Sequence, residues 1–496
     1  MGRDFTTTLL GFLIIALGFA VQLAGYVNLD NAWLLHVAER VVGAEQLGRQ
    51  VIESNPPLIV YIMEIPVYIA QTLNISLVHG FDLFMFLLIL ASLSLIKRHV
   101  NDRGVFLCIV FAVSVLPAWA FGEREHIFIL LILPYFVSLW NDKKFPLWFI
   151  IISALMAGVG IALKPFFLLI WAVLVLTKMV LDKRFWSFIN VQNIIIGLVV
   201  VAYVAYLFFI EKVYINEIFP LLVKYYGGFN GNAKDVYSQS IQLAILSQIA
   251  FWIVFIKDRK LLTRAIYLAN FANLASVLLI IIQAKTWMNY FYPPNFFGFV
   301  SNALITAVLF SDLKPLWNKV ASFISSFILM VFLTIAISTN LKIGLRVNED
   351  VTEDIIKVFN QYADGKPVYI LTFDLGTIFP AILYTNAKYH GRYGHFWSLP
   401  GMYSNGEVKD DELVYHQPGQ RLDDETRLIA QVMGDIANNP PEIIVVMDSS
   451  YYSRTIGDYK FDFVKYFSIE PEFAEMWENY EKIKTIGNYD IYKRQN

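Results

Sequence analysis

The chain has 496 residues, of which 57% are hydrophobic and only 16% are charged, and its mean hydropathy is +0.53. So few charges are atypical of a soluble protein of this length and indicate a membrane protein. The net charge of −2 gives no general attraction to nucleic acid. The single cysteine, Cys108, lies in an apolar run and excludes an intrachain disulfide.

Long apolar runs cross the chain as far as residue 339, and a transmembrane helix needs about 20 residues of this kind. Their number predicts a polytopic α-helical membrane protein with about eleven spans. The predicted spans are Phe5–Val27, Phe81–Ile96, Val105–Phe121, Ile127–Trp140, Phe145–Leu163, Phe166–Leu181, Val191–Ile210, Ser240–Ile256, Leu261–Ile282, Asn295–Phe310 and Leu316–Thr339. The first run exceeds the apolar core of a cleaved signal peptide, so we interpret it as a retained anchor.

The loops between these runs form two sets. One set holds most of the Lys and Arg near the spans and consists of Lys97–Arg103, Asn141–Lys144, Lys178–Arg184, Lys257–Arg264 and Asp312–Lys319. The other set holds acids, single lysines, Pro-Pro turns and aromatic residues, and consists of Asn28–Pro66, Gly122–His126, Leu163–Pro165, Glu211–Tyr237 and Gln283–Pro294. Lys and Arg accumulate on the cytoplasmic side. We therefore predict a multi-pass protein of the plasma (bacterial inner) membrane with a cytoplasmic N-terminus, whose second set of loops and C-terminal residues face outward.

The first outer loop, residues 28–66, begins with Asp30 at the membrane boundary. From Trp33 to Val41 apolar residues recur at helical spacing, which is typical of a helix that lies on the membrane surface. The segment Ser54–Leu58 contains a Pro-Pro pair that interrupts the pattern, and a second surface helix follows it. Asp30 could cap the first helix, could act as a catalytic base beneath the two helices, or could do both.

Four consecutive ionisable residues stand between two apolar runs at the second outer loop. Charges at membrane depth usually line a polar cavity, although a solvated turn would also carry them. The residues that could bind a phosphate or orient a base here are Glu123, Arg124, Glu125 and His126. A hard divalent cation, Mg²⁺ or Mn²⁺, would find oxygen and nitrogen ligands in the set Asp30, Glu123, Glu125 and His126.

Two later outer loops each contribute a lysine. Lys164 precedes Pro165 between two apolar runs, and a lone cation at this depth either snorkels to the interface or binds an anionic lipid headgroup. Lys285 is followed by Asn289 and Tyr290 among aromatic residues that could equally form an interfacial belt. We interpret Lys164, Lys285, Asn289 and Tyr290 as candidates for a phosphate or sugar site.

The composition becomes more polar from about residue 340, which predicts an extracytoplasmic domain, 340–496, after a membrane domain, 1–339. Apolar and amphipathic patterns predict a small α/β fold with strands Val368–Thr372 and Ile443–Met447, a helix Thr426–Ile436, and a hairpin of Lys482–Ile486 with Tyr489–Lys493. The aromatic segment Tyr389–Trp397 also carries Arg392 and His395. This segment either contacts carbohydrate or packs the domain onto the surface helices.

The chain resembles the GT-C superfamily of integral-membrane glycosyltransferases in four features. These are a short N-terminus, one span, an acid that opens a long first outer loop with two surface helices, and a later Pro-Pro pair. Its members include protein O-mannosyltransferases, lipid A aminoarabinose transferases and mycobacterial arabinofuranosyltransferases. The resemblance implies that Asp30 deprotonates the acceptor and that Lys164 is directed at the donor phosphate. Ser54–Pro57 looks like the acid-Lys-Pro-Pro segment of the aminoarabinose transferases, in which Asn55 here replaces the lysine and Glu53 could substitute for the acid.

The chemistry of an outward-facing site agrees with this resemblance. Nucleotide sugars are cytoplasmic, so an activated sugar has to arrive on a lipid, and a transferase then needs a carboxylate for the acceptor hydroxyl and cations for the phosphate. We predict transfer of a monosaccharide from a polyprenyl-phosphate lipid to a cell-envelope glycan, lipid or protein. The alternatives are a secondary transporter or flippase, which would place its ionisable residues near the midplane, and a non-catalytic assembly protein in which Asp30 is dispensable.

Overall fold

The computed structural model of the chain describes residues 2–140, 144–309, 349–376, 378–409, 412–448 and 460–495. The contacts of the chain divide it into two compact units. The first, here called the helical unit, contains Met1–Tyr26, Asp82–Tyr206 and Gly231–Val347. The second, here called the mixed unit, contains Val27–Phe81, Leu207–Asn230 and Asn348–Asn496. The mixed unit thus joins residues of two predicted outer loops to the C-terminal part of the chain.

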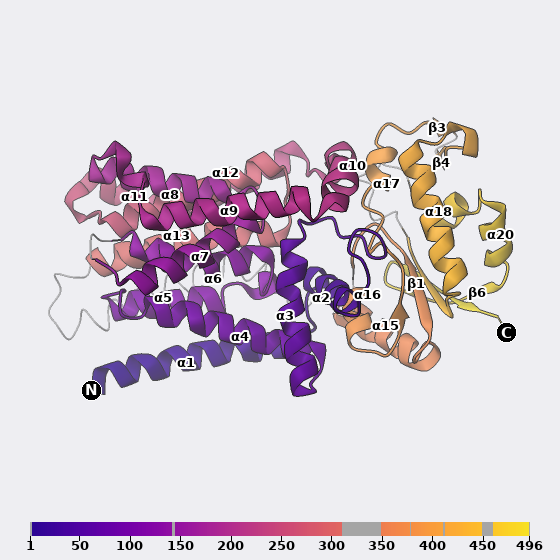
Figure 1. Cartoon of the computed structure of the whole chain (residues 1–496), viewed down its shortest axis with the longest axis horizontal. Helices are drawn as coiled ribbons and strands as arrows, with labels where there is room; N and C mark the ends of the chain where they lie inside the picture. The colour runs from indigo at the N-terminus through magenta and orange to yellow at the C-terminus, as the bar shows by residue number, and fades with distance from the viewer. Residues whose placement is uncertain are drawn as a thin grey trace. The chain divides into compact units, whose positions relative to one another are not determined.

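A helix coincides with each predicted span from Phe5 to Phe310 (Figure 1). These helices are α1 (Gly2–Leu23), α4 (Leu77–Ile96), α5 (Arg103–Ser114), α6 (Arg124–Ser138), α7 (Leu147–Ala162), α8 (Phe167–Asp182), α9 (Val191–Phe209), α11 (Ala233–Lys257), α12 (Arg264–Gln283) and α13 (Tyr292–Leu309). The predicted last span, Leu316–Thr339, lies outside the described residues. By length and composition, four of the described helices could each cross a membrane, or five if the bent α11 is included. The polytopic helical class is confirmed, and the total of eleven spans stays a prediction.

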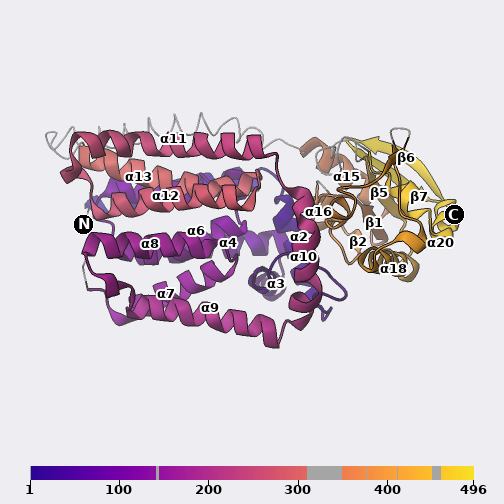
Figure 2. The ribbon, with the colours of Figure 1, turned by 90° about the horizontal axis from the view of Figure 1, so that it is seen from above.

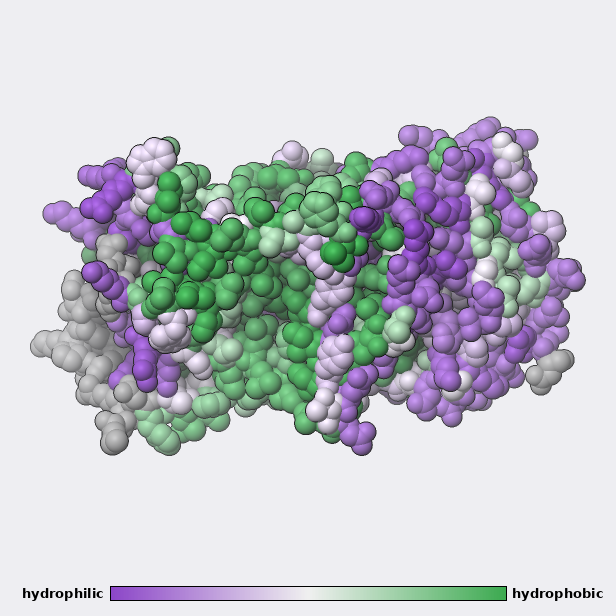
Figure 3. All heavy atoms as spheres, in the orientation of Figure 1, coloured by the Kyte–Doolittle hydropathy of each residue, from purple (hydrophilic) through white to green (hydrophobic). Residues whose placement is uncertain are grey.

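Helices α6 and α13 lie inside the helical unit, while α9 lies at its edge (Figure 2). Every residue of α6 is buried, and α13 packs against α5, α6, α11 and α12. In contrast, α9 is largely exposed and presents apolar side chains such as Leu198, Val201 and Phe208. The surface of the helical unit is hydrophobic over a broad area (Figure 3). An apolar exterior of this kind is typical of helices that face lipid.

The C-terminal residues form a five-stranded sheet in the order β2-β1-β5-β7-β6. Its strands are β1 (Pro367–Leu371), β2 (Lys388–Tyr389), β5 (Ile443–Met447), β6 (Tyr480–Ile486) and β7 (Tyr489–Arg494). Strands β2, β1 and β5 are parallel, with Val368 opposite Ile443, whereas β7 is antiparallel to β5 and β6. The predicted strands and hairpin are confirmed. The inner strands β1 and β5 are continuous buried apolar runs, and Gly487 supplies the φ of +58° in the turn between β6 and β7.

Short helices and one further strand pair complete the mixed unit. They are η3 (Tyr214–Ile218), α10 (Phe219–Tyr225), α15 (Glu349–Tyr362), α16 (Ile378–Leu383), α17 (Leu399–Met402), α18 (Asp423–Asn438), α19 (Phe463–Phe467), α20 (Pro471–Trp477), β3 (Val408–Lys409) and β4 (Glu412–Leu413). The helix predicted at Thr426–Ile436 is confirmed as α18, which buries Leu428, Val432 and Ile436 on one face. Three acids in its first turn complement the helix dipole.

The first outer loop contains the two predicted helices, α2 (Leu29–Val42) and α3 (Leu58–Leu73), which pack against each other. The N-cap of α2 is Asn28, whose side chain accepts a hydrogen bond of 2.9 Å from the backbone N–H of Asn31. Asp30 is therefore not the cap, but it lies in the first turn, where the helix dipole favours an acid. Residues 31–38 are buried and α2 also packs against α16, so α2 belongs to the core of the mixed unit.

Candidate functional site

Lys164 and Glu125 form a buried ion pair in the helical unit. Glu125 lies in the first turn of α6, and Lys164 lies in the short connection between α7 and α8. The distance between Lys164 Nζ and Glu125 Oε1 is 2.5 Å, and the two residues are 6% and 2% exposed. Glu123, Arg124 and His126 are buried as well, so the second outer loop is not a solvated turn. Lys164 does not snorkel outward, because an acid holds its ammonium group inside the protein.

An amide and an aromatic ring of η6 (Met288–Phe291) extend this pair. Asn289, which is 1% exposed, directs its Nδ2 toward Glu125 Oε2 at 3.4 Å. Lys164 Nζ lies 4.3 Å from the centre of the Tyr290 ring. The structure therefore brings together four residues that the sequence predicted in three separate loops, namely Glu125, Lys164, Asn289 and Tyr290.

The second predicted lysine, Lys285, is connected to Tyr290 by contacts through Trp287. The rings of Tyr290 and Trp287 are 5.9 Å apart, and Lys285 Nζ lies 5.3 Å from the centre of the Trp287 ring. We call the series Lys164, Tyr290, Trp287 and Lys285 the cation–aromatic ladder. Lys285 is 4% exposed, and burial lowers its pKa to about 8. An anion beside Lys285 would favour its charged form and would itself be bound more tightly.

Glu123 and Arg124 contribute charge to the same cluster. Glu123 attracts the ammonium group of Lys164, whereas Arg124 repels that group and attracts the carboxylate of Glu125. Two acids and two cations thus act on one another in a buried place. An anion that bound here would compete with Glu125 for the ammonium group of Lys164.

His126 holds the loop and does not face an open site. Its Nδ1 accepts a hydrogen bond of 3.0 Å from the backbone N–H of Gly122, and its Nε2 donates one of 2.8 Å to the Val113 carbonyl. Both ring nitrogens are therefore engaged, so His126 would have to break a bond to bind a metal ion. Within the described part of the chain, no group of three or more His, Cys, Asp or Glu side chains is arranged to hold a metal ion. A bound Mg²⁺ or Mn²⁺ stays a prediction.

Glu53 organises the first outer loop in the mixed unit. Its Oε2 accepts a hydrogen bond of 2.5 Å from the indole N–H of Trp33. Its Oε1 accepts hydrogen bonds from the backbone N–H of Asn55 at 2.7 Å and from the Asn55 side chain at 2.5 Å. Glu53 is only 3% exposed. This carboxylate therefore ties α2 to the turn before α3, and Trp33 lies one helical turn after the half-buried Asp30.

The aromatic segment 389–397 is packed inside the mixed unit. Tyr389, Phe396 and Trp397 are buried, and a Cβ atom at Gly394 would lie 2.8 Å from the Trp33 ring, so the segment lies tightly on α2. These aromatic faces are not open to a sugar, which agrees with the packing alternative.

The two polar residues of this segment are also engaged or buried. Arg392 donates to both carboxylate oxygens of Asp435, at 2.8 Å through Nε and at 2.9 Å through its backbone N–H. Burial lowers the pKa of His395 to about 4, so this ring is neutral at physiological pH. Carbohydrate contact by Arg392 and His395 stays a prediction.

The predicted site residues are thus distributed over both units. Asp30, Glu53, Asn55, Arg392 and His395 belong to the mixed unit, and the remaining predicted site residues belong to the helical unit. Two residues that the sequence analysis did not assign, Trp33 and Trp287, are direct neighbours of predicted ones. Their position was a usable signal, because Trp33 follows Asp30 by one helical turn and Trp287 follows Lys285 by two residues.

The chain combines a long loop with two helices, α2 and α3, a bundle of apolar helices and a small C-terminal α/β region. A solved structure with this fold is ArnT from Cupriavidus metallidurans bound to undecaprenyl phosphate. It matches with a TM-score of 0.53 over 99% of this chain and 98% of that chain, at 10% sequence identity. No protein-family model and no curated protein sequence matches the chain. The predicted resemblance is therefore confirmed at the level of the fold.

Proposed function

We propose that the protein is a glycosyltransferase that moves a monosaccharide from a polyprenyl-phosphate lipid to a cell-envelope acceptor at the outer face of the membrane. The observation that carries this proposal is the cation–aromatic ladder, whose two lysines are buried, in a chain with the GT-C fold. Support also comes from the solved structure with this fold, because ArnT is bound to undecaprenyl phosphate. Lysines, an amide and aromatic rings suit a phosphate that is attached to an apolar chain.

On the donor side, we assign phosphate binding to Lys164 and Lys285, with Arg124, Asn289 and Tyr290 around them. Glu125 neutralises Lys164 in the structure, so a bound phosphate would take over part of this role. When the bond between the anomeric carbon and the phosphate oxygen breaks, negative charge develops on the phosphate. Fixed cations in a buried site stabilise that charge more strongly than water does.

On the acceptor side, we assign Asp30 as the general base. The acceptor hydroxyl attacks the anomeric carbon and its proton passes to the Asp30 carboxylate, while the polyprenyl phosphate leaves with the electrons of the broken bond. The carboxylate of Glu53 already accepts hydrogen bonds from Trp33 and Asn55. We therefore assign Glu53 to positioning the loop and not to proton transfer.

Donor-lipid binding can be tested before the sugar is identified, with undecaprenyl phosphate as the probe and native mass spectrometry of the purified protein as the measurement. We expect Lys164→Ala and Lys285→Ala each to weaken binding by about tenfold or more, as expected for a lost charge-assisted contact of about 1.5–3 kcal/mol. The matched control is Lys178→Ala, because Lys178 pairs with Asp182 at the opposite end of α8. Wild-type affinity in both ladder variants would remove the assigned phosphate site.

A further inference from the structure

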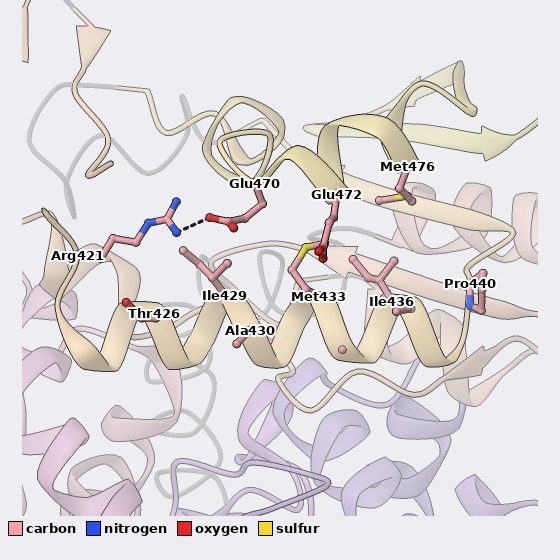
Figure 4. A pocket seen from close by; sticks show the side chains of 12 residues that line it. Arg421, Thr426, Ile429, Ala430, Met433, Ile436, Pro440, Glu470, Glu472 and Met476 are labelled. Atoms are coloured by element: carbon pink, nitrogen blue, oxygen red, sulfur yellow. Dashed lines mark hydrogen bonds and ion pairs between the residues drawn. The ribbon is translucent and has the colours of Figure 1, made fainter. Parts of the chain in front are cut away.

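The mixed unit contains a groove that the proposed transfer reaction does not use. It has a volume of about 570 Å³ and runs between α18 and α20, with Glu470 just before α20 (Figure 4). Its apolar surface comes from Ile429, Met433 and Ile436 of α18 and from Met476 of α20. Its volume lies within the range of typical ligand sites, roughly 300–1,000 Å³.

The shape of the groove favours an extended chain. The lining positions of α18 run from Thr426 to Ala437, which corresponds to about 17 Å along the helix axis. An extended segment of about five residues would fit this length, because a strand rises by about 3.3 Å per residue.

The charges at the groove favour a basic occupant. Arg421 pairs with Glu470, which leaves the carboxylate of Glu472 as the excess charge among the ionisable lining residues. In Figure 4 the Glu472 side chain extends across the groove toward Met433. A carboxylate at the edge of an apolar groove attracts a Lys or Arg side chain and repels an anionic lipid headgroup.

The two methionines of the groove also suit a peptide. Met433 and Met476 provide flexible, polarizable side chains, which suit surfaces that accept varied apolar side chains.

The floor of the groove is open at Gly434. A Cβ atom at this position would meet nothing within 4 Å, although a glycine inside a helix is less favourable than alanine by roughly 0.5–1 kcal/mol. Gly434 thus makes α18 less stable than alanine would, at a position that lines the groove. This position provides a variant that blocks the groove without disfavouring the helix.

We propose that this groove binds an extended segment of a partner protein in which a basic residue is flanked by apolar residues. The proposal is independent of the transfer reaction, because none of its residues belongs to the donor or acceptor groups assigned above. Binding of a lipid acyl chain is the competing possibility, and the experiment is designed to separate the two.

The test selects linear hexapeptides from a displayed random library on the purified full-length protein in detergent. We expect a consensus with one Lys or Arg between apolar residues. Binding of a synthetic consensus peptide should fall at least tenfold in Gly434→Leu and in Glu472→Gln, and Glu472→Lys should select acidic peptides instead. The matched control is Gly197→Leu, because Gly197 lies in α9 and also has open space at its Cβ position.

Several results would overturn the proposal. These are the absence of any consensus, an acidic consensus on the wild type, or equal binding of the consensus peptide to Gly434→Leu. A lipid that co-purifies with the wild type, is identified by mass spectrometry, and is lost in Gly434→Leu would assign the groove to an acyl chain.

Discussion

Glu125 and Lys164 neutralise each other inside a bundle whose other residues are largely apolar. Each charge alone would be costly to bury, and together they are tolerated because their atoms lie 2.5 Å apart. The same pair gives the site a resident anion that a phosphate can partly replace. The pair is therefore costly to break, and in the proposed function it takes part in binding the donor lipid.

Removal of one partner of this pair should destabilise the protein more than removal of both. We expect Lys164→Met or Glu125→Gln to lower the free energy of unfolding by about 3–5 kcal/mol, because each leaves an uncompensated buried charge. The double variant should lose less than the sum of the two. Thermal unfolding in detergent measures this, with Lys178→Met as the control, whose more exposed pair contributes about 0–1 kcal/mol. Strictly additive losses would contradict a direct coupling.

Asp30 is the residue on which the proposed chemistry depends most. Asp30→Asn keeps the size of the side chain in the first turn of α2 and removes the basic oxygen. We expect sugar transfer to fall by about 10²–10⁴-fold while binding of undecaprenyl phosphate is unchanged. Glu39→Gln, an exposed acid on the same helix, is the matched control. Near-normal turnover in Asp30→Asn would exclude this residue as the base.

At the scale of elements, α2 contacts both the Glu53 loop and the aromatic segment 389–397 of the mixed unit. Its Trp33 donates to Glu53, and the ring of Trp33 lies against Gly394 of the C-terminal residues. One helix therefore positions Asp30 and at the same time packs the segment that the sequence suggested for carbohydrate contact. The aromatic residues of that segment serve this packing.

The burial of His36 in α2 makes the mixed unit sensitive to acid. His36 is 7% exposed, and burial together with the nearby Arg40 lowers its pKa from 6.5 to about 3. Between these values the unfolded chain binds a proton that the folded chain does not, so stability falls as the pH falls below 6.5. The loss at pH 5 is about 2 kcal/mol.

This acid sensitivity is measured by thermal unfolding at pH 7.5 and pH 5. We expect the difference between the two unfolding temperatures to shrink in His36→Gln, because glutamine does not titrate. His79→Gln, at an exposed position in α4, should keep the wild-type difference. An unchanged difference in His36→Gln would show that another group controls the response.

At the scale of the whole molecule, the orientation in the membrane decides whether the proposed donor can be reached. The predicted count of about eleven spans leads to the prediction that the C-terminal residues lie outside. Alkaline phosphatase fused after residue 496 should therefore be active, and the same reporter inserted at residue 183 should be inactive. Activity of the reporter at residue 183 alone would contradict the predicted orientation and place the C-terminal residues on the cytoplasmic side.

Local sequence patterns were enough to predict a polytopic helical membrane protein and many of its helices and strands. Hydropathy places the helices because each has to bury or expose a long apolar stretch. Short continuous apolar runs place the strands β1 and β5, and the Gly-Asn turn places the hairpin. The candidate residues Lys164, Lys285, Asn289 and Tyr290 were found because polar groups between apolar runs are rare and costly. These signals are local and need no knowledge of long-range contacts.

The partners of these residues follow from the tertiary structure. Contacts between distant parts of the chain pair Lys164 with Glu125, so that Lys164 does not snorkel. They also direct His126 to a carbonyl and pack the aromatic segment 389–397. The role of Glu53 as a tie between Trp33 and Asn55 is of the same kind. Composition and periodicity specify which side chains must be satisfied, but the partner that satisfies each one is fixed by the packing of the helices and the sheet.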